Sequence, residues 1–341
     1  MADSLTLIAS NDPFRIAFNL FGLNVYWYGI FSALGYFIAI LIFLFVTSKR
    51  YKLSYEIPFY YIFFAIPMIL LGARLWSVII GDASINQFFN FREGGLAIQG
   101  GVIFGVITAL IYFPLILRLP KYHLRVVQDG NVYIRRPSIL IFADAIIPTI
   151  LIGQAIGRWG NFFNGEIFGQ AVNASQLEWL KNLMPSVFNH MTPAVGLTVN
   201  GFSHLQKYFQ PLFLYESFLN IVTFTIIYGA FAEIRWFKAG TIASLYFVDY
   251  AIIRFVMEPL RNSSFTFAGT YVINSLFLLG GLLAFIYYQF ISIRLRKYKL
   301  WKFVQDKFNF IFNKKQNISN PKIGDLKYIR KDSEIIYFVN R

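Results

Sequence analysis

Residues 157–169 read GRWGNFFNGEIFG and directly follow an apolar run from Pro137 to Ile156. An arginine beside lipid costs roughly 2.5–3.5 kcal/mol at the centre of a membrane helix, so such a residue usually has a partner or a ligand. Guanidinium and amide groups recognise phosphate oxygens, and glycines let the backbone approach a ligand closely. The stretch therefore indicates a site for a phosphate-bearing ligand, formed by Arg158, Asn161, Asn164 and Glu166. The alternative is an ordinary helix end, at which Arg158 extends to the lipid headgroups.

The composition indicates a membrane protein. Of the 341 residues, 57% are hydrophobic and only 14% are charged, whereas soluble domains carry about 25% charged residues. In a membrane protein, positive charge first indicates which loops face the cytoplasm. We therefore do not interpret the net charge of +14 as a sign of nucleic-acid binding, and we expect no nucleic-acid partner. The chain has no cysteine, which excludes disulfides, a thiolate metal site and a cysteine nucleophile.

Several apolar stretches have the length of about 20 residues that a bilayer requires. They fall at 25–47, 57–80, 96–117, 138–156, 212–232, 240–258 and 270–292. The sequence thus predicts an all-α polytopic membrane protein, a bundle of seven transmembrane helices with a small extracytoplasmic head region. We expect a transmembrane domain at 1–292, with the head at about 157–211, and a basic cytoplasmic tail at 293–341.

Positive charge gives the predicted orientation. Most of the 31 Lys and Arg residues lie in one class of loops and in the tail, the loops being 48–56, 118–137 and 233–239. Cytoplasmic loops carry the excess of positive charge, so we predict a cytoplasmic C-terminus and an extracytoplasmic N-terminus. Residues 157–169 then face the exterior.

Ionisable residues inside or at the ends of spans mark function by default. In this chain they are Arg74, Glu93, Asp144, Arg158, Glu166, Glu216, Asp249, Arg254 and Glu258. Arg254, Glu258 and Arg261 are spaced i, i+4, i+7 and share one helix face. Either Arg254 and Glu258 form a structural ion pair, or Arg254 joins Arg158 in holding an anion that Glu258 helps to orient.

Two other segments lie at the same predicted end of the bundle. Pairs of glycines at 94–95 and 100–101 flank Gln99. Each glycine in a helix costs about 1 kcal/mol relative to alanine, so these pairs favour close approach to a helix or a lipid, or a re-entrant turn. Tyr28 lies in an aromatic segment at 26–29, which is either an interfacial anchor or a hydroxyl within reach of a lipid headgroup. The combined pattern predicts a site for an anionic lipid headgroup.

These residues resemble the prolipoprotein diacylglyceryl transferase family. Residues 157–166 look like its signature, Gly169 follows at the expected position, and similar motifs occur in the same order at 27–29, 93–101, 211–216 and 254–261. The resemblance implies transfer of the diacylglyceryl group of phosphatidylglycerol to the lipobox cysteine thiol of a preprolipoprotein. A thioether forms and glycerol 1-phosphate leaves, which is the first step of lipoprotein maturation in the bacterial cell membrane.

The resemblance also implies the site residues. The candidate catalytic residues are Arg158, Arg254, Glu166, Asn161, Tyr28 and Gln99, and the candidate phosphatidylglycerol-binding residues are Arg158, Asn161, Gly169, Glu258, Arg261, Gly100 and Gly101. Arg158 and Arg254 would stabilise the charge that grows on the departing phosphate. We expect no metal and no cofactor. The expected partners are phosphatidylglycerol, signal peptides with a lipobox cysteine, and membrane lipids.

The sequence departs from the family at two positions, because the family usually has histidine where this chain has Gln99 and Gln210. Glutamine can position a group by hydrogen bonds but cannot act as a base near neutral pH. The alternatives for the base are Glu166, Glu258, headgroup-assisted deprotonation near Arg158, and the loop histidines His190 and His204. The alternative function is a non-catalytic anionic-lipid-binding membrane protein or a transporter. A transporter would show internal repeats and midplane polar groups, whereas these polar groups gather at one end.

Overall fold

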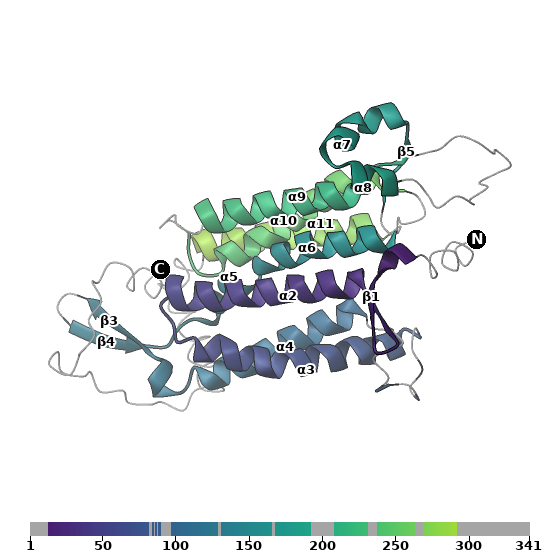
Figure 1. Ribbon diagram of the computed structural model, residues 1–341. Helices are drawn as coiled ribbons and strands as arrows, with labels where there is room; N and C mark the ends of the chain where they lie inside the picture. Colours follow the sequence, from purple (N-terminus) through teal and green to yellow (C-terminus); the bar gives the residue numbers. More distant parts are fainter. Residues whose placement is uncertain are drawn as a thin grey trace. The chain divides into compact units, whose positions relative to one another are not determined.

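The computed structural model describes residues 13–81, 84, 86, 88–89, 97–128, 131–165, 168–191, 208–230, 237–262 and 269–291. Helices make up most of these residues (Figure 1). The predicted tail at 293–341 lies outside the described residues. The chain divides into two compact units: the first comprises 1–39, 147–237 and 241–287, and the second comprises 40–146, 238–240 and 288–341.

Within the described residues, six helical segments are long and apolar enough to cross a membrane. They contain α2 (Trp27–Phe45), α3 (Glu56–Ile79), α4 (Ile98–Ile116), α5 (Ile139–Ile146) with α6 (Thr149–Asn164), α9 (Leu212–Thr225) and α11 (Thr270–Ile286). The prediction of an all-α multi-pass membrane protein is confirmed. The predicted span at 240–258 corresponds to α10 (Thr241–Met257), which has only 17 residues and carries Asp249 and Arg254, so the count of seven is not confirmed.

Three short antiparallel strand pairs accompany the helices, and the sequence analysis did not predict them. They are β1 (Ile16–Leu20) with β2 (Leu23–Tyr26), β3 (Leu124–Gln128) with β4 (Asn131–Arg135), and β5 (Ala171–Val172) with β6 (Tyr208–Phe209). Strands of two to five residues are too short to show a clear alternating pattern in the sequence.

The helix that carries the signature is longer than the sequence predicted. The predicted span ended at 156, but α6 continues through Arg158 and Asn161 to Asn164. Gly165 ends the helix with a left-handed backbone conformation, φ 65°, which glycine adopts without steric cost. Arg158 and Asn161 therefore lie on one helix face, as the spacing i, i+3 requires.

Packing within the first unit fixes α6 between other helices. On one side, α6 packs along α9, and a core of Leu151, Ile227, Ile242 and Tyr246 joins α6, α10 and the π-helical turn η7 (Ile226–Ala230) that follows α9. On another side, α6 meets α2 at small residues. A Cβ atom on Gly35 would lie 3.0 Å from the carbonyl oxygen of Gly153, and one on Gly160 would lie 3.0 Å from Cδ2 of Tyr28. Both contact pairs are seven residues apart on each helix, so antiparallel helices stay in contact over two turns.

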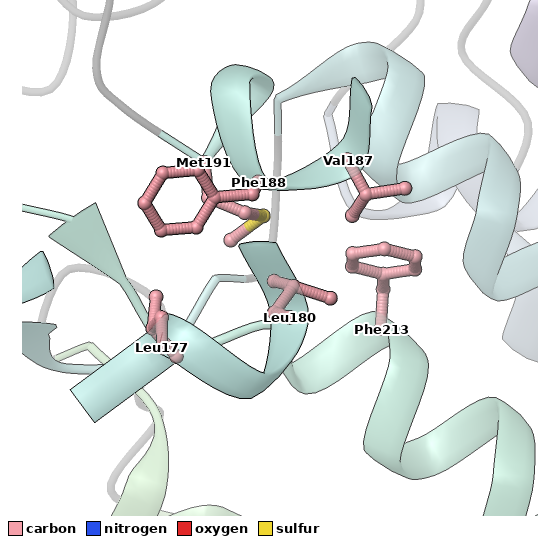
Figure 2. Packing of buried hydrophobic residues seen from close by; sticks show 6 residues of the cluster. All are labelled: Leu177, Leu180, Val187, Phe188, Met191 and Phe213. Carbon is pink, nitrogen blue, oxygen red and sulfur yellow. The ribbon is translucent and has the colours of Figure 1, made fainter. Parts of the chain in front are cut away.

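A small head covers the beginning of α9. It contains α7 (Glu178–Leu183), α8 (Pro185–His190) and the strands β5 and β6. Figure 2 shows its core, in which Phe213 of α9 points toward the side chains of α7 and α8. The members of this core are Leu177, Leu180, Val187, Phe188, Met191 and Phe213. Trp159 and Phe162 of α6 pack against it, so the head fixes the end of α6 that carries Arg158.

Glycines hold the two main helices of the second unit together. A Cβ atom on Gly100 of α4 would overlap the carbonyl oxygen of Gly72 and the Cβ of Trp76, and would lie 2.8 Å from the Gly72 carbonyl carbon. The backbone N–H of Ala97 donates to the carbonyl of Ala73 at 3.0 Å. Close approach to another helix therefore accounts for the second glycine pair, whereas the first pair, at 94–95, lies outside the described residues.

We predict that Gly100→Ala destabilises the protein by about 1–3 kcal/mol, because the added methyl group meets backbone atoms of α3 that cannot rotate away. The measurement is the free energy of unfolding in detergent micelles. The matched control is Gly280→Ala on α11, where a Cβ atom meets nothing within 4 Å. Equal stability of the two variants would contradict the packing argument.

Candidate functional site

In the first unit, one buried carboxylate forms ion pairs with three arginines. Glu216 of α9 forms ion pairs with Arg158 of α6, with Arg254 of α10 and with Arg261, which follows α10. The Arg261 Nη2–Glu216 Oε1 distance is 3.0 Å and the Arg254 Nη1–Glu216 Oε1 distance is 3.9 Å. Arg158 approaches the other carboxylate oxygen, Oε2, through Nη2. Glu216 of α9 thus connects α6, α10 and the segment that follows α10.

A second carboxylate completes the cluster. Glu258 begins a 3₁₀ turn that follows α10, in which Pro259 stops the α-helix. Its Oε2 atom lies 3.1 Å from Nη2 of Arg254 and 3.6 Å from Nε of Arg261, although neither geometry makes a hydrogen bond. The ion pair of Arg254 with Glu258 is present, whereas an anion held jointly by Arg254 and Arg158 stays a prediction. Arg254 pairs with Glu258, and it also shares Glu216 with Arg158.

The cluster is buried and carries more positive than negative charge. The side chains of Glu216 and Glu258 are each 2% exposed, Arg261 is 6% exposed, and Arg254 and Arg158 are 15% and 19% exposed. Burial lowers the pKa of the Arg261 guanidinium, and the charge of Arg254 lowers it further, while Glu216 and Glu258 raise it. Arginine stays protonated in proteins. Three guanidinium groups against two carboxylates leave a net charge of +1.

The arginines keep hydrogen-bond donors that no described residue uses. The Nε–H groups of Arg158, Arg254 and Arg261 are buried, and none has a hydrogen-bond partner within the part of the chain that the structure describes. A buried polar group without a partner is costly, and a ligand with oxygen acceptors would relieve that cost. An anion with several oxygens, such as a phosphate, fits the surplus charge and the unused donors.

Two other predicted residues lie beside Arg158. Asn161 accepts a hydrogen bond from Nη1 of Arg158 through its Oδ1 at 3.3 Å, so the amide orients the guanidinium plane. Tyr28 of α2 packs against Gly160, which directly precedes Asn161 and has no side chain to keep the ring away. The structure thus brings Tyr28 next to the turn of α6 that carries both polar residues.

Gly169 explains why Arg261 can reach the cluster. The backbone N–H of Gly169 donates to the carbonyl of Gln210 at 2.9 Å, and Gly169 also pairs with Arg261 as an antiparallel bridge. A Cβ atom on Gly169 would overlap the Leu212 side chain, would lie 2.6 Å from Cβ of Gln210 and would lie 2.9 Å from the carbonyl oxygen of Leu260. Only glycine lets these segments meet, and their meeting fixes the backbone of Arg261.

Other sequence-predicted site residues have different locations. Gln99, Gly100 and Gly101 belong to the first turn of α4 in the second unit. Glu166 lies outside the described residues, as do Glu93 and His204. The structure therefore brings together Arg158, Asn161, Tyr28, Gly169, Arg254, Glu258 and Arg261, and their roles in function stay predictions.

Two ionisable residues have local structural partners. Oδ2 of the buried Asp144 accepts the backbone N–H of Gly240 at 2.7 Å and so holds a turn in which Gly240 has φ 93°. The ring of His190 stacks on Phe14 with a centroid separation of 3.9 Å, and its Nδ1 lies 2.7 Å from the carbonyl oxygen of Ser186. These contacts give both side chains a role in packing.

Glu216 is among the ionisable residues that the sequence places in the spans, but its sequence context predicted no specific role in the site. Glu216 could have been identified from the sequence because no other carboxylate lies near it on the same helix. It is the one carboxylate in the sequence of α9, and three arginines elsewhere at the same predicted membrane level need a counter-charge.

Together, the helices and the buried charge cluster define a multi-pass membrane protein with a cationic site in one of its units. The family model described as prolipoprotein diacylglyceryl transferase matches residues 15–291. The chain belongs to this family, and its class is that of a membrane transferase.

Relatives support the same assignment over nearly the whole chain. A protein of Ureaplasma urealyticum is 50% identical over 338 residues, which are 98% of this chain and 97% of the relative. A protein of Malacoplasma penetrans is 40% identical and covers 94% of this chain and 95% of itself. A protein of Clostridium botulinum is 32% identical and covers 80% of this chain and 95% of itself. All three are named phosphatidylglycerol--prolipoprotein diacylglyceryl transferase.

We predict that Glu216→Gln lowers the free energy of unfolding by roughly 3–5 kcal/mol, because it leaves three buried guanidinium groups with a single carboxylate. The change keeps the volume of the side chain, so the effect reports on charge. Chemical unfolding in detergent measures it. Glu178→Gln, which removes an exposed carboxylate from the head, is the control, and a loss no larger than that of the control would contradict the prediction.

Proposed function

We propose that this protein transfers the diacylglyceryl group of phosphatidylglycerol to the thiol of a lipobox cysteine in a preprolipoprotein. The sulfur forms a thioether with the glycerol carbon, the carbon–oxygen bond to phosphate breaks, and glycerol 1-phosphate leaves. The thiol proton passes to a base. The observation that carries the proposal is the buried cluster of three arginines around Glu216, in a chain that belongs to the prolipoprotein diacylglyceryl transferase family.

The cluster suits the charge changes of this reaction. Phosphatidylglycerol enters with one negative charge on its phosphodiester, and the leaving glycerol phosphate gains a second. Arg158 and Arg254 share a carboxylate and are the most exposed arginines of the cluster, so they are the groups that a phosphate would meet first. Donors that are already oriented when charge develops lower the barrier without the cost of reorganisation.

Further residues of the first unit would position the lipid. Asn161 holds the guanidinium of Arg158 and offers its amide N–H groups to the glycerol hydroxyls. The phosphatidylglycerol site would also be shaped by Arg261, Glu258 and Gly169. Gly169 fixes the backbone of Arg261, and the carboxylate of Glu258 pairs with the guanidinium of Arg261. The hydroxyl of Tyr28 would donate a hydrogen bond to the headgroup. In the second unit, Gln99, Gly100 and Gly101 would contribute an amide and close backbone approach.

We propose two carboxylates as candidate acceptors of the thiol proton. Glu258 has a buried Oε2 atom that lies near Arg254 and Arg261 and has no hydrogen-bond partner in the described part of the chain. Glu166, which the sequence places two residues after Asn164, is the other. Gln99 and Gln210 cannot accept a proton near neutral pH, so in this chain they would act by hydrogen bonding.

The proposed setting is the bacterial cell membrane, with the N-terminus outside and the C-terminus in the cytoplasm. Residues 1–292 would form the catalytic domain, with an extracytoplasmic head at about 157–211, and 293–341 would form the cytoplasmic tail. The excess of Lys and Arg in 48–56, 118–137 and the tail supports this orientation. The substrates would then be outer-leaflet phosphatidylglycerol and an exported signal peptide.

The central test uses purified protein, phosphatidylglycerol vesicles and a lipobox peptide. We expect the wild-type protein to release glycerol 1-phosphate and to add one diacylglyceryl group to the peptide, measured by mass spectrometry. Phosphatidylcholine vesicles and a peptide with serine in place of the cysteine are the controls. No product with the wild type or with Gln99→His would contradict the proposed reaction and favour a non-catalytic lipid-binding protein or a transporter.

The Gln99→His variant separates two further outcomes of the same assay. We predict that the wild type turns over, because the charge cluster does not include residue 99. Activity that appeared only in Gln99→His would mean that the natural chain lacks a working base for this reaction. The comparison therefore measures what histidine at this position contributes.

We predict that Arg158→Ala lowers the transfer rate by about 10²–10³, the cost of removing one oriented donor from a developing oxyanion. The variant should still insert into the membrane, because the remaining two arginines match the two carboxylates. Lys181→Ala removes an exposed cation from the head and is the matched control, for which we expect wild-type turnover. An unchanged rate in Arg158→Ala would contradict the proposed site.

A further inference from the structure

The β1–β2 hairpin presents an apolar surface that the proposed reaction does not use. Strand partners across the hairpin are Leu20 with Leu23, Asn19 with Asn24, and Phe18 with Val25. Successive pairs point to opposite faces of a two-stranded sheet. One face therefore carries the apolar pairs, and the other carries the asparagine pair, whose side chains are hydrogen-bonded at 2.9 Å.

The apolar face is strongly exposed. Phe18, Leu20 and Leu23 are each about half exposed, at 50%, 49% and 50%, and Phe21 at the tip is 95% exposed. A free-standing two-stranded hairpin is marginally stable at best in water, and an exposed strand edge is normally protected by charged residues. No charged residue occurs between Ile16 and Tyr26. The hairpin is thus poorly suited to water.

The turn adds a second observation. Phe21 and Gly22 connect the strands with positive φ angles of 51° and 80°. A two-residue turn with both φ angles positive favours asparagine, aspartate or glycine at its first position, and a bulky residue there is strained. Among the described residues, the most exposed large hydrophobic side chain thus lies where the backbone disfavours a bulky residue. Strain of this kind persists where the side chain has a function.

The base of the hairpin is firmly held. Arg15 donates a hydrogen bond to the carbonyl oxygen of Asn164 at the end of α6. The neighbouring Phe14 stacks on Phe163 with a centroid separation of 5.0 Å. The hairpin therefore projects from a fixed point at the end of α6.

The hairpin continues without a break into a lipid-facing helix. Tyr26 ends β2 and Trp27 begins α2, whose Tyr36 and Phe37 are exposed as expected for contact with acyl chains. Trp27 at this junction is typical of the membrane–water interface. The hairpin is thus directly connected in the chain to a helix whose exposed side chains suit contact with lipid.

Backbone chemistry limits how deep the hairpin can lie. Both outer edges of a two-stranded hairpin carry unpaired N–H and C=O groups, which cannot enter the hydrocarbon without a large cost. At the headgroup level, water and lipid oxygens satisfy these groups while apolar side chains point to the acyl chains. The asparagine pair on the opposite face fits contact with headgroups and water.

We propose that the β1–β2 hairpin is an interfacial membrane anchor: the side chains of Phe18, Leu20, Phe21 and Leu23 insert at the headgroup–acyl boundary of the leaflet that contains the first turn of α2. The occupant of this face is lipid. Anchoring would hold α2, and with it Tyr28, at a constant depth relative to the lipid headgroups.

The absence of cysteine from the chain allows a direct test by spin labelling. Phe21→Cys and Asn24→Cys are each labelled with a nitroxide in phosphatidylglycerol-containing vesicles. Accessibility to oxygen, which partitions into lipid, is compared with accessibility to a water-soluble nickel complex. We expect the label at 21 to lie roughly 5–10 Å below the phosphate level, the depth of interfacial amphipathic elements, and the label at 24 to be more accessible to nickel.

The control for the apolar face is Leu20→Asp with Leu23→Asp in the Phe21→Cys background, which should move the label into water. Circular dichroism verifies that each labelled protein keeps its helices, so the result does not depend on transferase activity. Equal nickel accessibility at 21 and 24 would overturn the proposal. Protection of position 21 only after a lipobox peptide is added would also overturn it, because the face would then bind peptide rather than lipid.

Discussion

The ion pairs of Glu216 are the constraint on which the first unit depends. A carboxylate buried in an apolar helix is tolerated only when opposite charge and hydrogen bonds compensate its loss of hydration. Here the compensation comes from Arg158 on α6, from Arg254 on α10 and from Arg261 beyond it. None of these arginines can move away without leaving a buried charge, so α6, α9 and α10 must meet at this level. Gly169 serves the same constraint, because a side chain there would separate the backbone segments that place Arg261.

The same cluster that stabilises the fold is suited to bind an anion. With equal numbers of carboxylates and guanidinium groups it would be neutral and would have little affinity for phosphate. The third arginine leaves a charge of +1, and the buried Nε–H groups provide donors that the described residues do not satisfy. Glu216 also limits the attraction, since it competes with a ligand for the same guanidinium groups. An enzyme gains from this balance, because a site that bound the phosphodiester too tightly would lower the energy of the ground state as well as that of the transition state.

Sequence reasoning predicted the local part of this arrangement and missed the long-range part. Membrane insertion follows from apolar length, and the Arg254–Glu258 pair follows from the spacing i, i+4 on one helix. The same holds for Arg158 and Asn161, once α6 continues past residue 156. The contact of Glu216 with three arginines depends on how separate helices pack, which no periodicity in a single segment specifies. Short strands such as β5 and β6 were missed for the same reason, since their pairing joins residues that are far apart in the chain.

The position of Gln99 outside the charge cluster bears on what its substitution can do. Gln99 lies on α4 in the second unit, whereas every member of the cluster lies in the first. The carboxylates that pair with the arginines of the cluster, Glu216 and Glu258, both belong to the first unit. In the proposed reaction, a histidine-to-glutamine replacement at that position would change proton transfer or the orientation of a substrate, while the arginines proposed to stabilise the leaving phosphate would stay in place. A lipid-binding protein and a transferase would share the same arginines, and only turnover of the thiol separates the two.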